Sequence, residues 1–144
     1  MKLDENQRTE LIKYRLSEAT ETIQDVQLLL ENDRLRAAVN RIYYGMFYSL
    51  LALGLAYEFE TSKHQQLIGW FNKNFIYEGL IETKYGKIIN KASNRRTQGD
   101  YDSFVEFEKI IVLEMFEEMK EFIYRIEQFI AQKFIILPKI RTTS

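Results

Sequence analysis

Two adjacent arginines followed by a short acidic and aromatic run are the strongest chemical feature of this sequence. The segment NRRTQGDYDS, residues 94–103, places Arg95 and Arg96 just before Asp100 and Tyr101. Guanidinium groups pair bidentately with phosphate oxygens, so the segment could bind phosphate. The same residues could instead lock the end of a helix, with Asp100 accepting from an arginine and Tyr101 covering the joint. Their chemistry alone leaves both interpretations open.

Two other polar residues stand in apolar surroundings. His64, the only histidine of the chain, is in register with Ile68 and Phe71. It is either a hydrogen-bonded residue at the edge of the core or a polar group that points into a cleft. Arg41 lies within the most apolar segment. Because an unpaired buried charge is very costly, Arg41 must reach water or an acceptor, and we expect an aspartate as its partner.

Other kinds of site find little support. The chain has one histidine and no cysteine, and no glutamate stands three residues before His64, so we expect neither a metal nor a cofactor. Glycine-rich phosphate loops and Gly-x-Ser-x-Gly turns are absent. The aromatic residues beside Arg41 could stack on bases, but on so apolar a helix we assign them to the core: Tyr43, Tyr44, Phe47 and Tyr48.

Composition indicates one globular domain. The chain has 144 residues, of which 46% are hydrophobic and 14% aromatic, enough for a sizeable core. Its formal net charge is −1, so any contact with nucleic acid would be a local patch. We see neither an apolar leader segment nor a membrane-spanning run, and we expect a cytoplasmic protein that makes no contact with membranes.

Helical periodicity runs through almost the whole sequence. Apolar residues recur every three or four positions, and there is one proline, Pro138. We predict an all-α, single-domain antiparallel bundle of four to five helices over residues 1–133, with a C-terminal tail at 134–144. The second helix, residues 35–56, and the last long helix should lie in the core.

Helix ends were predicted from capping residues and breakers. Asn32 or Asp33 should cap the second helix, and Ser62 with Gln65 should form a capping box for a third helix that starts near Lys63. The third helix should end near Gly79.

The region after the third helix should hold two more helices. A fourth should run from about Ile81 to Arg96, after which Gly99 should permit the chain to reverse. Ser103 with Glu106 should form a capping box for the fifth helix, whose inner side would begin with Phe104 and Phe107.

Three motifs in order resemble the HEPN domain. They are AAVNRIYYGMFYSLLALGL at 37–55, SKHQQLIGWFNKNFI at 62–76 and RRTQGDY at 95–101. More narrowly, they are similar to the small stand-alone UPF0332-like group, over roughly residues 11–130. Each motif alone is weak, whereas their order and spacing together are specific.

The resemblance implies an all-α bundle that is usually a homodimer. It also implies a minimal nucleotidyltransferase as a partner, in a toxin–antitoxin pair. Active HEPN proteins are metal-independent endoribonucleases. Their motif is an arginine followed after four to six residues by a histidine, and two copies of it face each other across the dimer cleft.

Only part of that motif is present here. Arg96 matches the arginine, with Arg95 as the second choice, but the histidine positions after Arg96 hold Tyr101, Asp102 and Ser103. None of these replaces an imidazole in proton transfer near neutral pH. His64, which matches the pattern of the UPF0332-like group, is the candidate to substitute from another helix.

The resemblance therefore gives a set of candidate site residues. Arg96 and His64 are the catalytic candidates, and Arg95, Arg96 and Arg41 are the candidates for binding nucleotide or RNA phosphate. Asn40, Asp100 and Tyr101 are the candidates for supporting roles, and no metal ligand is among them.

Two functions follow as hypotheses. In the first, the protein binds RNA or a nucleotide as the toxin-like half of a pair with a minimal nucleotidyltransferase, with RNA cleavage at a degenerate motif as an open extension. In the second, it is a non-catalytic helical dimerisation protein whose polar residues only lock the interface.

Overall fold

The structure, a computed structural model, describes residues 3–135 of the chain and side chains to residue 133. Within these residues the chain is helical and has no strand, which confirms the predicted all-α class. The elements are α1 (Glu5–Glu31), α2 (Leu35–Ala56), α3 (His64–Phe71), the π-helical turn η1 (Asn72–Ile76), α4 (Thr83–Tyr101), α5 (Lys109–Ile130) and the π-helical turn η2 (Ala131–Ile135). The tail predicted from residue 134 lies, beyond η2, outside the described residues.

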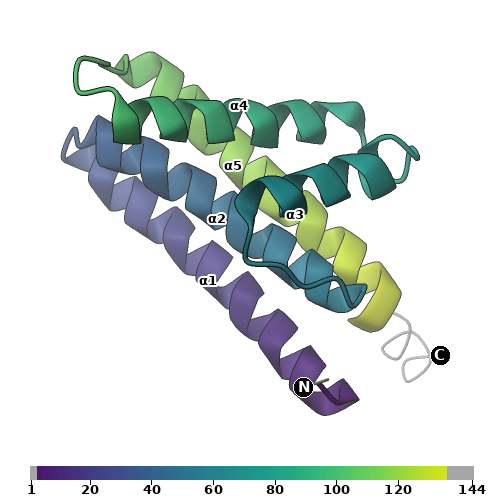
Figure 1. Ribbon diagram of the computed structural model, residues 1–144. Helices are drawn as coiled ribbons and strands as arrows, with labels where there is room; N and C mark the ends of the chain where they lie inside the picture. Colours follow the sequence, from purple (N-terminus) through teal and green to yellow (C-terminus); the bar gives the residue numbers. More distant parts are fainter. Residues whose placement is uncertain (1–2, 136–144) are drawn as a thin grey trace.

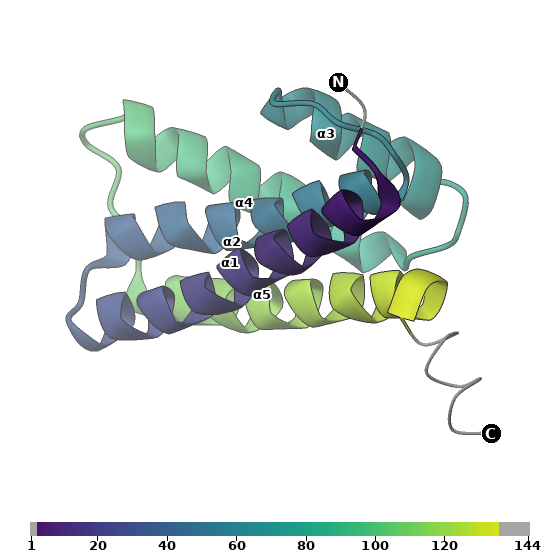
Figure 2. The ribbon, with the colours of Figure 1, turned by 90° about the horizontal axis from the view of Figure 1, so that it is seen from below.

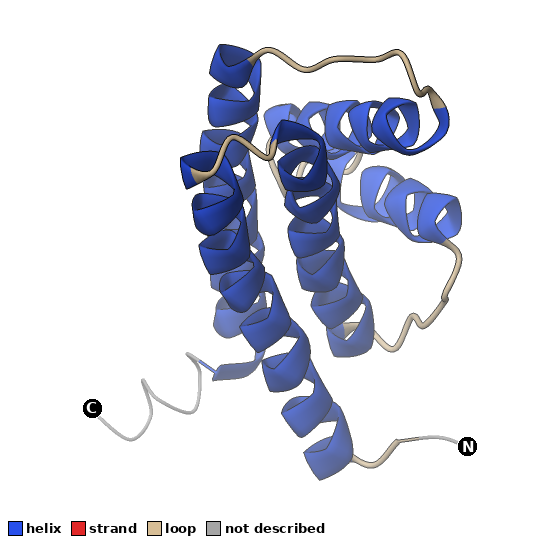
Figure 3. Cartoon of the chain, turned by 90° about the vertical axis from the view of Figure 1, so that its left-hand side faces the viewer, coloured by secondary structure: helices blue, strands red, loops and turns tan. Residues whose placement is uncertain are grey.

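The helix α2 is the centre of the bundle and contacts α1, α3, α4 and α5. Figures 1 and 2 show α1 and α4 antiparallel to α2, while α5 runs beside α2 in the same direction. Figure 3 shows helices and loops and no strand among residues 3–135. No helix in this range is long and apolar enough to cross a membrane.

The apolar stripes that the sequence predicts for α2 and α5 form the core. Fourteen residues of α2 are buried, including Tyr43, Met46 and Leu50. The matching face of α5 buries Met115, Phe116, Met119, Phe122 and Ile126, among others. Small residues permit close packing, since Gly45 lies against Met119 of α5 and Thr22 of α1. The central placement of α2 and α5 is therefore confirmed.

Two of the predicted helix caps are wrong. Asn32 ends α1, where its Nδ2 donates to the carbonyl of Leu28 at 2.8 Å, and Asp33 adopts a left-handed backbone with φ of 54°. Neither residue caps α2. The start of α3 is one residue from the prediction, but Thr61 rather than Ser62 accepts the Lys63 amide, at 3.1 Å.

The α4–α5 connection differs most from the prediction. Helix α4 continues to Tyr101, so Arg95 and Arg96 lie within it rather than at a break. Gly99 is a buried helical residue whose bare Cα lets the Phe107 ring approach, and it does not reverse the chain. No capping box forms at Ser103, because α5 begins only at Lys109. The prediction that Phe104 lies on the inner side of α5 is also wrong, since Phe104 precedes that helix and is 93% exposed.

An arginine of α2 explains the longer α4. Arg36 donates to the carbonyls of Gly99, Asp102 and Val105. The last carbonyls of a helix lack partners within the helix, and a cation is favourable at this end. Arg36 thus stabilises the last turn of α4 and fixes the following loop on α2.

We expect two glycine variants to change stability in opposite directions. A methyl group at Gly54 would lie 2.5 Å from the Phe59 carbonyl oxygen, at the end of α2. Gly54→Ala should therefore lower the free energy of unfolding by about 1–3 kcal/mol. Gly69, in α3, has no atom within 4 Å of an added methyl group. Gly69→Ala should raise that free energy by about 0.5–1 kcal/mol.

Urea unfolding of both variants beside the wild-type protein measures these changes. A Gly54→Ala protein as stable as the wild type would show that the end of α2 is packed differently from the arrangement described here.

Candidate functional site

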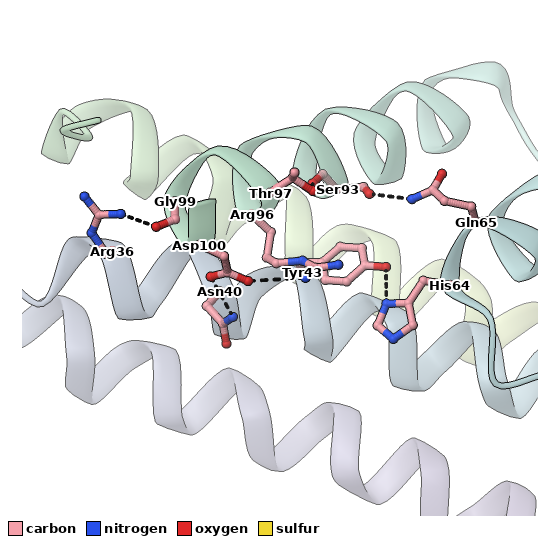
Figure 4. Close-up of polar contacts among 10 residues, drawn as sticks. All are labelled: Arg36, Asn40, Tyr43, His64, Gln65, Ser93, Arg96, Thr97, Gly99 and Asp100. Atoms are coloured by element: carbon pink, nitrogen blue, oxygen red, sulfur yellow. Dashed lines mark hydrogen bonds and ion pairs between the residues drawn. The ribbon is translucent and has the colours of Figure 1, made fainter. Parts of the chain in front are cut away.

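The Arg96 side chain lies between α4 and α2. Its guanidinium carbon is 4.8 Å from the centre of the Tyr43 ring and 5.5 Å from that of Tyr44. Nη1 donates to Oδ2 of Asp100 at 3.2 Å, and 14% of the side chain is exposed. Figure 4 shows the guanidinium between Asp100 and the Tyr43 ring. The charge is therefore held between the two helices by one carboxylate and two aromatic faces.

Asp100 links the same two helices. Its Oδ1 accepts from Nδ2 of Asn40, on α2, at 3.4 Å, while Oδ2 accepts from Arg96. About a third of the Asp100 side chain remains exposed. Asn40 and Asp100, both supporting candidates from the sequence, thus lie in direct contact with each other and beside Arg96.

His64 reaches the cluster from the first residue of α3. Its Nδ1 is 2.8 Å from the Tyr43 hydroxyl, and its ring stacks on Phe47 with centroids 4.0 Å apart and planes 17° apart. Burial, together with the positive charge of Arg96, lowers the pKa of His64. The imidazole is therefore held in one orientation and stays neutral at neutral pH.

Arg41 joins the cluster through Tyr44. Its guanidinium carbon is 5.3 Å from the centre of that ring, and Nη2 donates to the Tyr48 hydroxyl at 3.1 Å. The prediction that an aspartate would pair with Arg41 is wrong for the described residues, where the Tyr48 hydroxyl is its hydrogen-bond partner. Because the side chain is only half-buried, two aromatic faces, one acceptor and water can hold the charge.

Two sequence candidates lie apart from the cluster. The Arg95 side chain is half-buried and forms no hydrogen bond or ion pair within the described part of the chain. Tyr101 is 80% exposed and does not cover the joint between the helices. Neither residue takes part in the contacts that bring Arg41, His64 and Arg96 together.

The residues that organise the site are not among those predicted from the sequence. Tyr43, Tyr44 and Phe47 were assigned to the core alone, yet each contacts His64, and the two tyrosines also face Arg96. A signal was present in the sequence. Arg36, Asn40, Tyr43 and Phe47 recur every three or four residues, which marks one polar and aromatic face of α2.

Binding is the chemistry that this arrangement supports most directly. The cluster offers two guanidinium groups, one neutral imidazole and partly exposed aromatic edges. Among the described residues, no group of three or more histidine, aspartate or glutamate side chains is arranged to hold a metal ion. Guanidinium groups beside aromatic rings are suited to phosphate and to stacked bases.

The lowered pKa of His64 should make stability depend on pH in a defined window. The unfolded chain takes up the His64 proton near pH 6.5 and the folded chain only at lower pH. The stabilisation from a neutral His64 is therefore present above about pH 6.5 and is lost as the pH falls below it.

Urea unfolding of wild type and His64→Gln between about pH 7.5 and 5 measures this effect. The stability advantage of the wild type should shrink on acidification, and carboxylates that titrate in both proteins cancel in the comparison. An advantage that stays constant would show that His64 titrates alike in the folded and unfolded chains.

Comparisons with known proteins agree with this architecture. A family model described as HEPN domain matches residues 12–131. A protein from Thermotoga maritima named "UPF0332 protein" is 38% identical over 125 residues, which are 87% of this chain and 95% of the relative. A Methanocaldococcus jannaschii protein named "Putative toxin" is 36% identical over 121 residues, or 84% of each chain.

A second Methanocaldococcus jannaschii protein of the same name is 33% identical over 94 residues, 65% of this chain and 64% of the relative. The family match begins at residue 12, within α1, and ends just after α5, so it includes Arg41, His64 and Arg96. The chain belongs to the HEPN domain family.

Proposed function

We propose that this HEPN protein binds phosphate groups of RNA or of a nucleotide at the cluster of Arg41, His64 and Arg96. One observation carries the proposal. These three residues come from α2, α3 and α4, and all three contact Tyr44. Three separate helices thus bring two cations and an imidazole to one aromatic side chain, which is partly exposed.

The local charge fits a phosphodiester. Arg41 and Arg96 each carry +1, Asp100 carries −1, and His64 is neutral, so the cluster has a formal charge of +1. The whole chain has a formal charge of −1. Attraction of an anion is therefore local, as expected for a site that binds one or two phosphates rather than a long basic surface.

The names of the relatives support a toxin-like role. Two relatives are named "Putative toxin", and we extend that role to this chain together with a minimal nucleotidyltransferase as its partner. We also propose a homodimer in which the end of α4 faces the second copy. Tyr101 and Phe104 are strongly exposed there, and a partner surface would bury them.

RNA cleavage is a separate extension of the proposal. It requires a group that transfers protons near neutral pH, and His64 is the only imidazole in the chain. The assignment of His64 to binding or to proton transfer therefore decides whether the site could be an endoribonuclease of the ordinary acid–base type.

A second candidate function, a non-catalytic dimerisation module, is favoured by a different observation. Arg96 has an internal partner in Asp100, and most of its side chain is buried. Asp100 also accepts from Asn40, and Arg96 lies over the Tyr43 ring, so the pair joins α4 to α2 without any ligand. Under this interpretation the polar residues stabilise the helix packing and do not bind RNA.

Replacement of Arg41 should weaken RNA binding selectively. Arg41→Gln removes a half-exposed cation whose side chain, among residues 3–135, makes one hydrogen bond, to Tyr48. Loss of a charge-assisted contact should cost about 1.5 kcal/mol or more, roughly tenfold in affinity. Fluorescence anisotropy with a labelled single-stranded RNA of about twelve nucleotides at low salt measures it, because such binding weakens with salt.

Arg125→Gln is the matched control. Arg125 also lies over an aromatic ring, that of Phe129, but it is on α5 and its hydrogen-bond partner is a carboxylate, Glu82, at 2.9 Å. The charge change is the same as in Arg41→Gln, but Arg125 lies outside the cluster, so RNA affinity should stay close to that of the wild type. Equal losses of affinity in both variants would mean that binding follows the overall charge, which would contradict a phosphate site at the cluster.

Asp100→Asn separates binding from a purely structural lock. The amide cannot pair with Arg96 as an anion, so stability should fall by about 1 kcal/mol under either interpretation. If Arg96 binds phosphate, removal of the competing carboxylate should hold or raise RNA affinity, measured by the same anisotropy. If neither the wild type nor the variant binds RNA while the variant loses stability, the result supports a purely structural role for Arg96 and Asp100.

A further inference from the structure

The contact between His64 and Tyr43 can be made in two ways. Either the tyrosine hydroxyl donates to Nδ1, or a protonated Nδ1 donates to the tyrosine oxygen. In the first case a neutral His64 carries its proton on Nε2, and in the second case Nε2 has a free lone pair. The choice decides whether the outer nitrogen of His64 acts as a donor or as a base.

A hydrogen bond between α3 and α4 holds His64 beside the Tyr43 hydroxyl. Gln65, which follows His64 on α3, donates from Nε2 to the Ser93 hydroxyl at 3.2 Å. Because Ser93 lies on α4, this contact fixes the first turn of α3 against that helix. Figure 4 shows Gln65 and Ser93 on one side of the Tyr43 hydroxyl and His64 below it.

The buried tyrosine hydroxyl favours the first case. Its one hydrogen bond among the described residues joins it to Nδ1 of His64, so a hydroxyl that accepted from Nδ1 would leave its own proton without an acceptor there. Burial raises the pKa of Tyr43, although the positive charge of Arg96 opposes the rise, and the hydroxyl keeps its proton. A guanidinium has no acceptor atom, so Arg96 cannot take the tyrosine proton. Tyr43 is fully buried, and no water competes for its hydroxyl. Its proton is therefore directed to Nδ1 of His64.

We propose that Tyr43 is a positioning residue that holds neutral His64 with its proton on Nε2, so that His64 binds a ligand oxygen as a hydrogen-bond donor. The hydrogen bond from the Tyr43 hydroxyl to Nδ1 joins α2 to α3. The ligand part of this inference rests on the proposed phosphate site, whereas the position of the proton does not.

The outer nitrogen is available for such a role. The imidazole of His64 makes one hydrogen bond within the described residues, in which Nδ1 accepts from the Tyr43 hydroxyl. Nε2 has no hydrogen-bond partner there. Among the described residues, the one buried side-chain polar atom without a partner is Nε of Arg96, so Nε2 of His64 is not buried and is accessible to solvent. A neutral N–H beside a guanidinium complements a phosphodiester oxygen.

The same arrangement argues against proton transfer by His64. A general base must accept a proton at an accessible nitrogen, yet Nδ1 is already occupied by the Tyr43 proton and Nε2 already carries one. His64 is therefore assigned to binding, and Arg96 supplies the charge.

Nitrogen-15 NMR of the imidazole tests the assignment without any ligand. The chain has one histidine, so long-range proton–nitrogen spectra of untagged protein report His64 alone. At about pH 7.5, above the ordinary histidine pKa, Nε2 should show the shift of a protonated ring nitrogen and Nδ1 that of an unprotonated acceptor. Tyr43→Phe should move both shifts toward the averaged values of a free imidazole.

A proton found on Nδ1 of the wild-type protein would overturn the proposal, whether or not the variants fold. Wild-type shifts as expected that do not move in a folded Tyr43→Phe protein would also overturn it, because Tyr43 would then not set the position of the proton.

RNA binding supplies the second arm. Glutamine offers an N–H donor but cannot act as an imidazole base, so His64→Gln should keep RNA affinity within about threefold, while His64→Leu should lose about tenfold. Equal losses in the two variants would overturn the donor role. If the wild-type protein does not bind RNA, the proposed function and the donor role of His64 are both overturned. The position of the proton on Nε2 is then decided by the NMR spectra alone.

Discussion

The burial of α2 on nearly all sides is the constraint on which the rest of the molecule depends. Fourteen of its residues are buried, and it contacts each of the other four α-helices. Burial of so much apolar surface supplies most of the folding free energy of such a bundle, and small residues such as Gly45 let α1 and α5 approach closely. The other helices are positioned by the faces that α2 offers to them.

One of those faces is polar and aromatic rather than purely apolar. Arg36 holds the carbonyls at the end of α4, Asn40 holds Asp100, and Tyr43 lies under Arg96 and beside His64. Buried polar groups are tolerable only when they are paired, and here the pairs cross from α2 to α3 and α4. The contacts that fix these two helices are therefore the contacts that assemble the candidate site, so packing and binding share the same residues.

The sequence predicted the part of the fold that periodicity controls. The limits of α2, the inner face of α5 and the left-handed Gly79 at the end of the third helical region follow from local pattern. The end of α4 could not be predicted in the same way. Gly99 resembles a breaker in sequence, whereas its role is to admit the Phe107 ring, and the stabilising Arg36 is 63 residues away.

The candidate site was predictable to a similar degree. Arg41, His64 and Arg96 stand out because charged or titratable groups are rare in apolar segments, and the family resemblance singles out the same residues. Tyr43 was missed because a tyrosine on an apolar helix has the same pattern whether its hydroxyl is used or not. Only the three-dimensional arrangement shows that its hydroxyl meets a histidine from another helix.

The central claim is that Arg41, His64 and Arg96 form one ligand site although they belong to three helices. The most direct measurement is an NMR titration of isotope-labelled protein with a short single-stranded RNA, following the His64 imidazole and the arginine Nε–H signals together. The account predicts that the signals of His64, Arg41 and Arg96 move with one common dissociation constant, while that of Arg125 stays in place. Signals of His64 and Arg96 that remain unchanged at RNA concentrations that shift other residues would contradict it.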